Sequence, residues 1–338
     1  MASENRMEAP QEEGPSSEPF FSHYVNGFQI PMFPLENFRS ALEYKPIPGD
    51  VFIITYPKCG TTWAQQILVL IFRQGVPLES RKEFNDATPF MDAKGAKSAE
   101  DMPRPNAIKT HLPFRLIPWS DQAKYIYIAR NPKDCCVSYL HHMRNIPHRG
   151  FEGNFDEFFE LFMDGKMHYE DYFEHLMEWY KHRNDPNVLF LTYEQMHEDT
   201  EAAILKMASF IDDEKYAEPL RTDNEKLKNV VKFSSFKSMK EAAEKRVEEV
   251  LSMTEEEILN SDIPKGERMS ILRIRERSDV SKAKNNSHIM QNIRKGVVGD
   301  WRNYFSEDQC QRMDEKFAEI TKGTELENLW KDYMQFYF

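Results

Sequence analysis

The sequence predicts an α/β fold in which a parallel sheet is flanked by helices on both faces. From Phe20 to about Lys240, short apolar segments alternate with longer amphipathic ones. The apolar run Val51–Thr55 leads directly into a loop with Pro and Gly and then into a helix start. Strand followed by helix, repeated along a chain, is typical of a parallel sheet. A chain of 338 residues is long enough for one large α/β domain or two small ones.

The apolar runs and amphipathic segments define the expected elements in order. Strands are expected at Val51–Thr55, Ala107–Lys109, Lys124–Ala129 and Val188–Thr192. Helices are expected at Thr62–Gln74, Pro132–Met143, Phe155–Met163, Tyr169–His182 and Thr200–Phe210. In parallel sheets, ligands collect beyond the carboxyl ends of the strands. The residues at these ends are therefore the first candidates for a site.

Two segments depart from this alternation. Residues 1–19 are acidic and rich in Pro, Ser and Glu, which predicts a disordered tail before a domain at 20–338. The stretch at about 241–290 is dense in Glu, Lys and Arg, with one helical piece near Glu241–Leu259. A solvated surface helix with a mobile loop is favoured there over a dedicated partner surface.

Composition excludes several classes of protein. The net charge of −12 argues against nucleic acid or an anionic membrane as the main partner. The four cysteines show neither a disulfide framework nor a C-x-x-C pattern, which suits a reducing compartment. The first residues lack the basic and apolar regions of a signal peptide, and the aliphatic run Ile67–Phe72 is too short to span a bilayer. We expect a cytoplasmic protein.

The most informative segment follows the first expected strand and reads Tyr56-Pro57-Lys58-Cys59-Gly60-Thr61-Thr62-Trp63. A tight loop that opens a helix can bind phosphate, because the first helical N–H groups and the helix dipole both favour an anion. Lys58 adds a positive charge. The order G-x-x-x-x-G-K-[ST] of a Walker A loop is absent. The segment by itself indicates only that a phosphate binds here.

The other strand ends also carry polar residues. Lys109-Thr110-His111, Arg130 and Tyr193 all fall at expected carboxyl ends. A single histidine is more often structural than catalytic, but Lys109 lies on the same side of an extended segment as His111. That pairing would direct a base and a cation at one reacting centre.

Two further basic segments lie farther along the chain. Arg130-Asn131-Pro132-Lys133-Asp134 opens the expected helix that carries Ser138. Without other observations, Arg130 would simply pair with Asp134 and Ser138 would face solvent. Arg294-Lys295-Gly296-Val297-Val298-Gly299-Asp300-Trp301 joins two cations to a glycine turn, where an arginine fork and a close backbone suit a phosphate.

Taken together, these segments resemble the cytosolic sulfotransferases, which use 3′-phosphoadenosine 5′-phosphosulfate (PAPS). The matches, in the family's order, are Y-P-K-x-G-T-T-W, K-T-H-L-P, R-N-P-K-D with Ser138, and R-K-G-x-x-G-D-W. The resemblance covers roughly 33–328 apart from the 241–290 region. It implies a single domain similar to the P-loop NTPases, with a 5′-phosphosulfate-binding loop in place of a Walker A loop.

The resemblance also implies which residues bind the nucleotide. The 5′-phosphosulfate would be held by Lys58, Gly60, Thr61 and Thr62, with Cys59 contributing its backbone. The 3′-phosphate that distinguishes PAPS from ATP would be held by Arg130, Ser138, Arg294, Lys295 and Gly296. The adenine would lie between Trp63 and Phe236, with Tyr193 and Ser234 as polar contacts.

The implied reaction moves a planar sulfuryl group in line between two oxygens, as in phosphoryl transfer. A neutral His111 would take the proton from the acceptor, while Lys58 and Lys109 would stabilise the transferred charge. The product of the donor would be adenosine 3′,5′-bisphosphate (PAP). No metal is required, and the adjacent His141 and His142 on one helix make a poor ligand pair.

Three features, the loop cysteine, the acceptor pocket and the dimer motif, depart from the family pattern or are uncertain in it. Cys59 stands where relatives often have Ser, and a thiol at a helix N-terminus beside Lys58 would have a lowered pKa, although a backbone-only role is favoured. Phe90 and His142 should border the acceptor pocket, which favours small phenols or aromatic amine alcohols over bulky steroids. The usual dimer motif K-x-x-x-T-V-x-x-x-E is degenerate, reading Arg302, Ser306, Glu307 and Gln311 at the matching positions, so a homodimer is possible but doubtful.

Alternatives to a sulfotransferase of small hydroxylated acceptors remain open. Sulfation followed by elimination would make a dehydratase of an allylic alcohol such as retinol, and steroids or other aliphatic alcohols are alternative acceptors. A non-catalytic PAP binder would be expected to lack His111 or Lys109, and both are present. An ATP-dependent kinase is disfavoured by the missing Walker lysine and the surplus of cations. In the fold that the resemblance implies, the charged 241–290 region lies over the acceptor and cofactor sites, so a lid is one hypothesis for its role.

Overall fold

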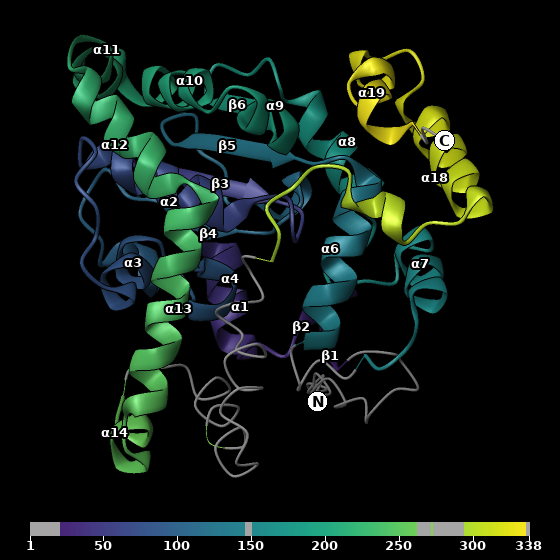
Figure 1. Cartoon of the computed structure of the whole chain (residues 1–338), viewed down its shortest axis with the longest axis horizontal. Coiled ribbons are helices and arrows are strands. Elements are labelled where there is room, and N and C mark those ends of the chain that lie inside the picture. Colours follow the sequence, from purple (N-terminus) through teal and green to yellow (C-terminus); the bar gives the residue numbers. More distant parts are fainter. Residues whose placement is uncertain (1–20, 146–150, 262–271, 273–293, 336–338) are drawn as a thin grey trace, which may run out of the picture.

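The computed structural model describes residues 21–145, 151–261, 272 and 294–335. The expected tail at 1–19 and most of the expected lid beyond 261 lie outside the described residues. Figure 1 shows the order of the elements along the chain, and the C-terminal helices lie beside α6 and α7. No helix among the described residues is long and apolar enough to cross a membrane.

The first half of the chain builds the edge and centre of the sheet. Its elements are β1 (Ser22–Val25), β2 (Phe28–Pro31), α1 (Leu35–Glu43), β3 (Val51–Thr55), α2 (Thr61–Phe72), α3 (Arg81–Ala87), α4 (Met91–Lys94), α5 (Lys97–Glu100), β4 (Ile108–Thr110), η1 (Phe114–Leu116), β5 (Lys124–Ala129), α6 (Pro132–Asn145) and α7 (Phe155–Met163). β1 and β2 pair as a separate antiparallel hairpin.

The second half adds the last strand and most of the outer helices. Its elements are α8 (Tyr172–Lys181), β6 (Val188–Thr192), α9 (Tyr193–Glu198), α10 (Thr200–Asp212), η3 (Asp213–Ala217), α11 (Glu218–Thr222), α12 (Asn224–Ser234), α13 (Phe236–Ser252), α14 (Glu255–Leu259), η4 (Asp300–Asn303), α18 (Glu307–Thr321), η5 (Glu325–Asn328) and α19 (Lys331–Met334). In Figure 1, α13 runs away from the sheet and ends beside α14.

The described strands β4, β3, β5 and β6 form a four-stranded parallel sheet in that order. The predicted parallel sheet is therefore confirmed. The bounds of β3, β5 and β6 agree with the sequence expectation, and β4 is shifted by one residue. The expected helices are present too, but α8 begins at Tyr172 rather than Tyr169, because Tyr169 and Glu170 have left-handed φ angles of 68° and 62° and Asp171 caps the helix.

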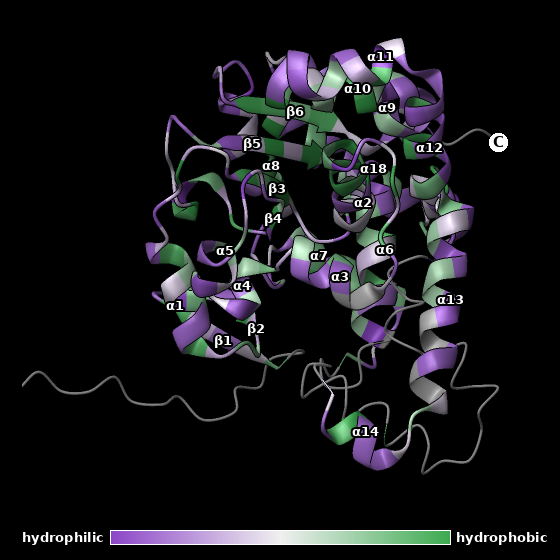
Figure 2. Cartoon of the chain, turned by 90° about the vertical axis from the view of Figure 1, so that its left-hand side faces the viewer, coloured by the Kyte–Doolittle hydropathy of each residue, from purple (hydrophilic) through white to green (hydrophobic). Residues whose placement is uncertain are grey.

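Alternate strand residues enter two separate cores, so both faces of the sheet are covered. Phe52 and Tyr127 pack into one core with residues of α1, α6 and α8. Ile53 and Ile126 pack into the other with residues of α2, α10 and α12. Buried on both faces, the strands are apolar along most of their length, and β6 is coloured as hydrophobic in Figure 2. This three-layer arrangement leaves the strand ends as the natural place for polar chemistry.

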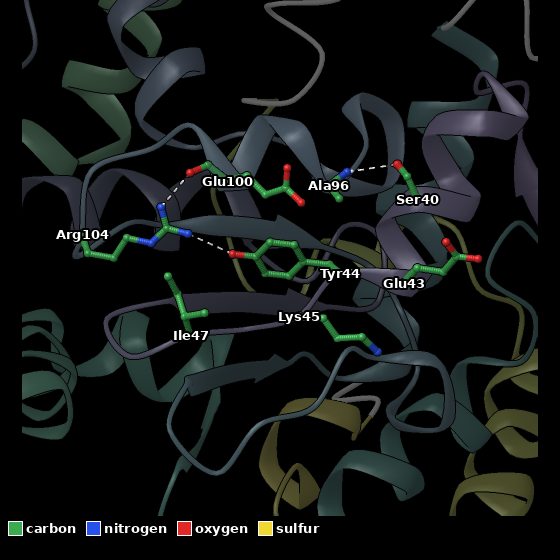
Figure 3. A pocket seen from close by; sticks show the side chains of 8 residues that line it. All are labelled: Ser40, Glu43, Tyr44, Lys45, Ile47, Ala96, Glu100 and Arg104. Carbon is green, nitrogen blue, oxygen red and sulfur yellow. Dashed lines mark hydrogen bonds between the residues drawn. The ribbon is translucent and has the colours of Figure 1, made fainter.

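A hollow of about 390 Å³ lies away from those strand ends, beside the residues that precede β3. It is lined by Ser40, Glu43, Tyr44, Lys45, Ile47, Ala96, Glu100 and Arg104 (Figure 3). The guanidinium of Arg104 already donates to Asp50 and to the Tyr44 hydroxyl, both at 3.0 Å. Because the Arg104 guanidinium and the Tyr44 hydroxyl are bonded within the protein, we interpret this hollow as part of the scaffold.

The degenerate dimer motif serves the chain's own C-terminal packing. The guanidinium of Arg302 donates to the Gln335 carbonyl at 2.7 Å. Ser306 caps α18 in a capping box with Gln309. These contacts lie within one chain, and a homodimer stays a possibility that the sequence left open.

Candidate active site

The loop between β3 and α2 makes a tight turn that only glycine can complete. Lys58 and Gly60 have left-handed φ angles of 73° and 101°. A Cβ atom at position 60 would lie 2.7 Å from a ring carbon of Tyr193, which is too close for any side chain. α2 then begins at Thr61, so its free N-terminal N–H groups lie directly after the turn. This is the geometry expected of an anion-binding loop.

His111 is bonded to the end of the same strand. Because β3 and β4 are parallel neighbours, with Ile54 opposite Thr110, the residues that follow them meet. The Nδ1 atom of His111 lies 2.8 Å from the Thr55 carbonyl oxygen, and the Thr55 and Thr61 hydroxyl oxygens are 2.6 Å apart. The candidate base and the phosphate loop are thus joined through one strand end.

The environment of His111 keeps its imidazole neutral. The side chain is buried, and burial together with the charge of Lys109 holds its pKa well below the ordinary value of 6.5. A neutral ring that donates from Nδ1 to the Thr55 carbonyl carries its lone pair on Nε2. His111 therefore has the protonation state that a general base requires.

Lys109 and Phe90 lie beside His111, as the sequence suggested. Phe90 forms a parallel bridge with Lys109, and the Lys109 ammonium lies 4.0 Å from the centre of the Phe90 ring. The Phe90 and His111 rings are 5.2 Å apart. His142, the other expected pocket residue, is on α6 with its ring 6.1 Å from that of Tyr139, so its place in an acceptor pocket stays a prediction.

Arg130 connects the phosphate loop to the C-terminal basic segment. Its guanidinium donates to the Lys58 carbonyl at 3.2 Å and to the Val297 carbonyl at 3.3 Å. It lies over the Tyr193 ring at 4.4 Å, and Asp134 is 4.0 Å away. The Nε atom is buried and has no hydrogen-bond acceptor among the described residues. Ser138 is half-buried on α6, the helix that follows Arg130.

The segment 294–301 is held against α6 by Asp134. Its carboxylate accepts from the Gly299 N–H at 2.6 Å and from the Trp301 N–H at 3.1 Å. Within the segment, Arg294 and Lys295 donate to Asp300 at 2.5 Å and 2.7 Å. These bonds, acting against burial, lower the pKa of Asp300 to about 2. Two cations are thereby held side by side.

The expected adenine contacts come from several elements. Trp63 on α2 lies 5.4 Å from the Tyr193 ring, and its indole Nε1 is buried without a partner among the described residues. A Cβ atom at Gly296 would lie 2.3 Å from a ring carbon of Phe236, so the two residues are in close contact. Ser234 is fully buried and donates to the Val230 carbonyl at 2.7 Å. The contact of these residues with adenine stays a prediction.

The expected lowering of the Cys59 pKa is wrong. Cys59 is fully buried, and its sulfur lies 3.6 Å from that of Cys135. Burial and this contact raise the pKa of the Cys59 thiol well above its usual value. The position beside a helix N-terminus and Lys58 was visible in the sequence, but Cys135 as a neighbour was not. The four cysteines are all free and buried.

Sequence reasoning missed three residues that surround His111. The Tyr169 ring is 5.3 Å from the His111 ring, the Nε2 of His175 donates to the His111 carbonyl at 3.1 Å, and Asp92 accepts from the His111 N–H at 2.9 Å. They come from α4, α8 and the loop before α8, far from His111 in the chain. No motif signals them. Among the described residues, no group of three or more His, Cys, Asp or Glu side chains is placed to hold a metal ion.

Comparison with known proteins adds to this geometry. A family model described as the sulfotransferase domain matches residues 48–270 and 265–325. An amine sulfotransferase of Oryctolagus cuniculus is 32% identical over 83% of this chain and 83% of its own. Sulfotransferase 1C2 of Rattus norvegicus is 32% identical over 89% of this chain and 93% of its own.

Solved structures show the same architecture. Mouse sulfotransferase SULT7A1 in complex with PAP superposes with a TM-score of 0.67 at 25% identity, covering 92% of this chain and 98% of that one. A retinol dehydratase in complex with retinol and PAP gives a TM-score of 0.63 at 24% identity, covering 91% and 92%, and this likeness shows the fold alone.

We predict that His111 in the nucleotide-free protein stays neutral at pH 6.5, because burial and Lys109 disfavour its charged form. In the unfolded chain it takes up a proton near 6.5, so its protonation destabilises the fold only as the pH falls below that value. The measurement is a pH titration of the histidine ring signals by NMR, with His111 assigned through a His111→Gln variant. Urea-denatured protein provides the reference. A folded-state midpoint at or above the denatured one would contradict the prediction.

Proposed function

The chain belongs to the sulfotransferase domain family, and on this premise we propose that it transfers a sulfuryl group from PAPS to the hydroxyl or amine of a small acceptor. The observation that carries the proposal is the bond from His111 to the end of β3, which places a neutral base beside an anion-binding loop. A relative at 25% identity is named as a complex with PAP, the desulfated product of that donor.

The residues present fit the nucleotide. Glycine at positions 60 and 296 lets the Tyr193 and Phe236 rings pack against the backbone of the two basic segments, because a Cβ there would meet these rings at 2.7 Å and 2.3 Å. The buried Nε of Arg130 lacks an acceptor among the described residues, so a donor is available for an incoming anion. We assign the 5′-phosphosulfate to Lys58, Gly60, Thr61 and Thr62, and the 3′-phosphate to Arg130, Ser138, Arg294, Lys295 and Gly296. When bound, PAPS supplies the sulfuryl group and leaves as PAP.

Three side chains have distinct roles in the proposed reaction. His111 accepts the proton of the acceptor hydroxyl at Nε2, because Nδ1 is engaged by the Thr55 carbonyl. Lys58 and Lys109 provide preorganised positive charge for the transferred group and for the departing phosphate. Lys109 is suited to this because its ammonium is already fixed over the Phe90 ring, next to His111.

The acceptor that best suits the site is a small phenol or an aromatic amine alcohol. The ring centres of Phe90 and Tyr169 lie 5.2 Å and 5.3 Å from the centre of the His111 ring, so the base has aromatic neighbours against which a flat aromatic acceptor could pack. His142 would add a polar group to the pocket. One relative is named an amine sulfotransferase, which supports including amines among the acceptors to be tested.

Cytoplasmic localisation belongs to the same proposal. It is supported by four free, buried cysteines, which suit a reducing compartment. The charged region from 241 onward is described only in part, as α13 and α14. Its role as a lid stays a prediction.

An acceptor screen with labelled PAPS tests the function. We expect transfer to simple phenols or aromatic amine alcohols to exceed transfer to steroids, and His111→Ala to lower kcat by roughly 10²–10⁴-fold because the base is lost. His182→Ala is the matched control, since His182 is paired with Asp185 at 2.7 Å outside the site. Undiminished transfer by His111→Ala would overturn the base, and a far better steroid turnover would overturn the acceptor class. Release of an alkene and free sulfate would identify a dehydratase instead.

Nucleotide binding tests the 3′-phosphate assignment. Lys295→Ala removes a half-exposed cation held beside Arg294 by Asp300. We expect PAP to bind about tenfold to a hundredfold more weakly, as for one lost charged hydrogen bond, while AMP binding changes little. Isothermal titration calorimetry with both nucleotides measures this, and Lys237→Ala on the exposed surface of α13 is the control. Equal losses for PAP and AMP, or none for PAP, would contradict the assignment.

A further inference from the structure

The peptide groups on both sides of the His111 Cα are held by buried polar side chains. The Asp92 carboxylate accepts from the His111 N–H at 2.9 Å, and the His175 Nε2 donates to the His111 carbonyl at 3.1 Å. The Tyr127 hydroxyl lies 3.0 Å from His175 Nδ1, which fixes the tautomer of His175 with its proton on Nε2. Burial lowers the pKa of His175 to about 3, so this donor stays neutral. The backbone of the candidate base is therefore fixed independently of its ring.

Burial of the Asp92 carboxyl is energetically unfavourable. Its side chain is fully inaccessible, and burial raises the pKa of its carboxyl against hydrogen bonds from Thr110, His111 and Tyr169 and the charge of Lys109. A carboxylate without solvent costs free energy that an apolar side chain of similar size would not. We therefore look for a role of the hydrogen bonds that the Asp92 carboxylate accepts. Two of these bonds come from His111 and Tyr169, which lie beside the candidate reaction centre.

The second of these residues is Tyr169. Its hydroxyl donates to the same Asp92 oxygen at 3.0 Å, and its ring lies 5.3 Å from the His111 ring. Tyr169 and Glu170 both have left-handed φ angles, a strained conformation for residues other than glycine. Strain of this kind is kept only where surrounding contacts hold it. Asp92 is one such contact, because one of its carboxylate oxygens accepts from both the Tyr169 hydroxyl and the His111 N–H.

The short helix α4 gives Asp92 a rigid base. The Asn37 side chain donates to the Ala93 carbonyl at 2.9 Å, which joins α4 to α1. On the other side, Phe90 bridges to Lys109 on β4. The segment that carries Asp92 is thus held to α1 on one side and to β4, the strand that leads to His111, on the other.

We propose that Asp92 is a positioning residue, whose carboxylate holds the His111 peptide and the Tyr169 hydroxyl so that the imidazole is kept between the Phe90 and Tyr169 rings with Nδ1 on the Thr55 carbonyl. The proposal rests on the proposed function, in which His111 is the base. Asp92 itself touches neither nucleotide nor acceptor. Its removal should therefore lower kcat and leave nucleotide binding unchanged.

The test compares Asp92→Ala with Asp92→Asn. Alanine removes both hydrogen bonds, whereas an asparagine side-chain oxygen still accepts them. We expect Asp92→Ala to lower kcat by about tenfold to a hundredfold, as a small displacement of a catalytic group does, with PAP affinity within about twofold of the parent. Asp92→Asn should recover kcat to within about threefold of the parent. Asp101→Ala on the exposed end of α5 is the control.

Tyr169→Phe keeps the ring and removes the donor to Asp92, and it serves if Asp92→Ala fails to fold. It should lower kcat by about threefold to tenfold without weakening PAP binding. Equal losses of kcat and PAP affinity in these variants would overturn the proposal, because they would show a merely structural role. So would an unchanged kcat.

The NMR signal of the His111 ring separates this proposal from the function on which it rests. If His111→Ala retains transfer, the assignment of His111 as the base fails, yet a shifted His111 titration in Asp92→Ala would still show that Asp92 positions the His111 ring. If His111→Ala loses transfer but the His111 ring titrates identically in Asp92→Ala and the parent, the proposed function stands and the positioning role fails.

Discussion

The hydrogen bond between His111 Nδ1 and the Thr55 carbonyl is the contact on which the rest of the site depends. It fixes the tautomer of the imidazole and, since Thr55 ends β3, it sets the base at a fixed distance from the phosphate loop. The bond exists because β3 and β4 are parallel neighbours whose carboxyl ends lie at the same edge of the sheet. The sheet order thus determines that the candidate base lies beside the candidate anion-binding loop.

The strand on the other side of β3 also brings a polar residue to the site. Arg130 directly follows β5, the other neighbour of β3, and its guanidinium donates to the Lys58 and Val297 carbonyls. Asp134, one helical turn later, binds the N–H groups of Gly299 and Trp301. A segment from near the C-terminus is therefore placed beside a loop from the first third of the chain. We propose that Lys58 in this loop and the cations Arg130, Arg294 and Lys295 bind the two phosphate groups of the nucleotide.

Local sequence patterns were sufficient to predict the core strands and the basic motifs. They were insufficient to predict the residues that surround those motifs in space. β3, β5 and β6 could be predicted because they are continuous apolar runs, and His111 and Arg130 because they follow such runs. The hairpin β1–β2 and the short helix α4 carry no strong periodicity. Asp92 and Tyr169 reach His111 only through tertiary contacts, which one sequence does not reveal. The Cys59 pKa was misjudged for the same reason, since burial and Cys135 outweigh the nearby positive charge.

The central claim is that a neutral His111, held by the end of β3, removes the acceptor proton during transfer. The most direct test is the dependence of kcat/KM on the acidity of the acceptor, in a series of phenols whose pKa values run from about 7 to 10. With the base present, the rate should depend only weakly on phenol acidity. In His111→Ala only ionised phenols should react well, so the rate should rise steeply as the phenol pKa falls. The same dependence in both proteins would contradict the claim.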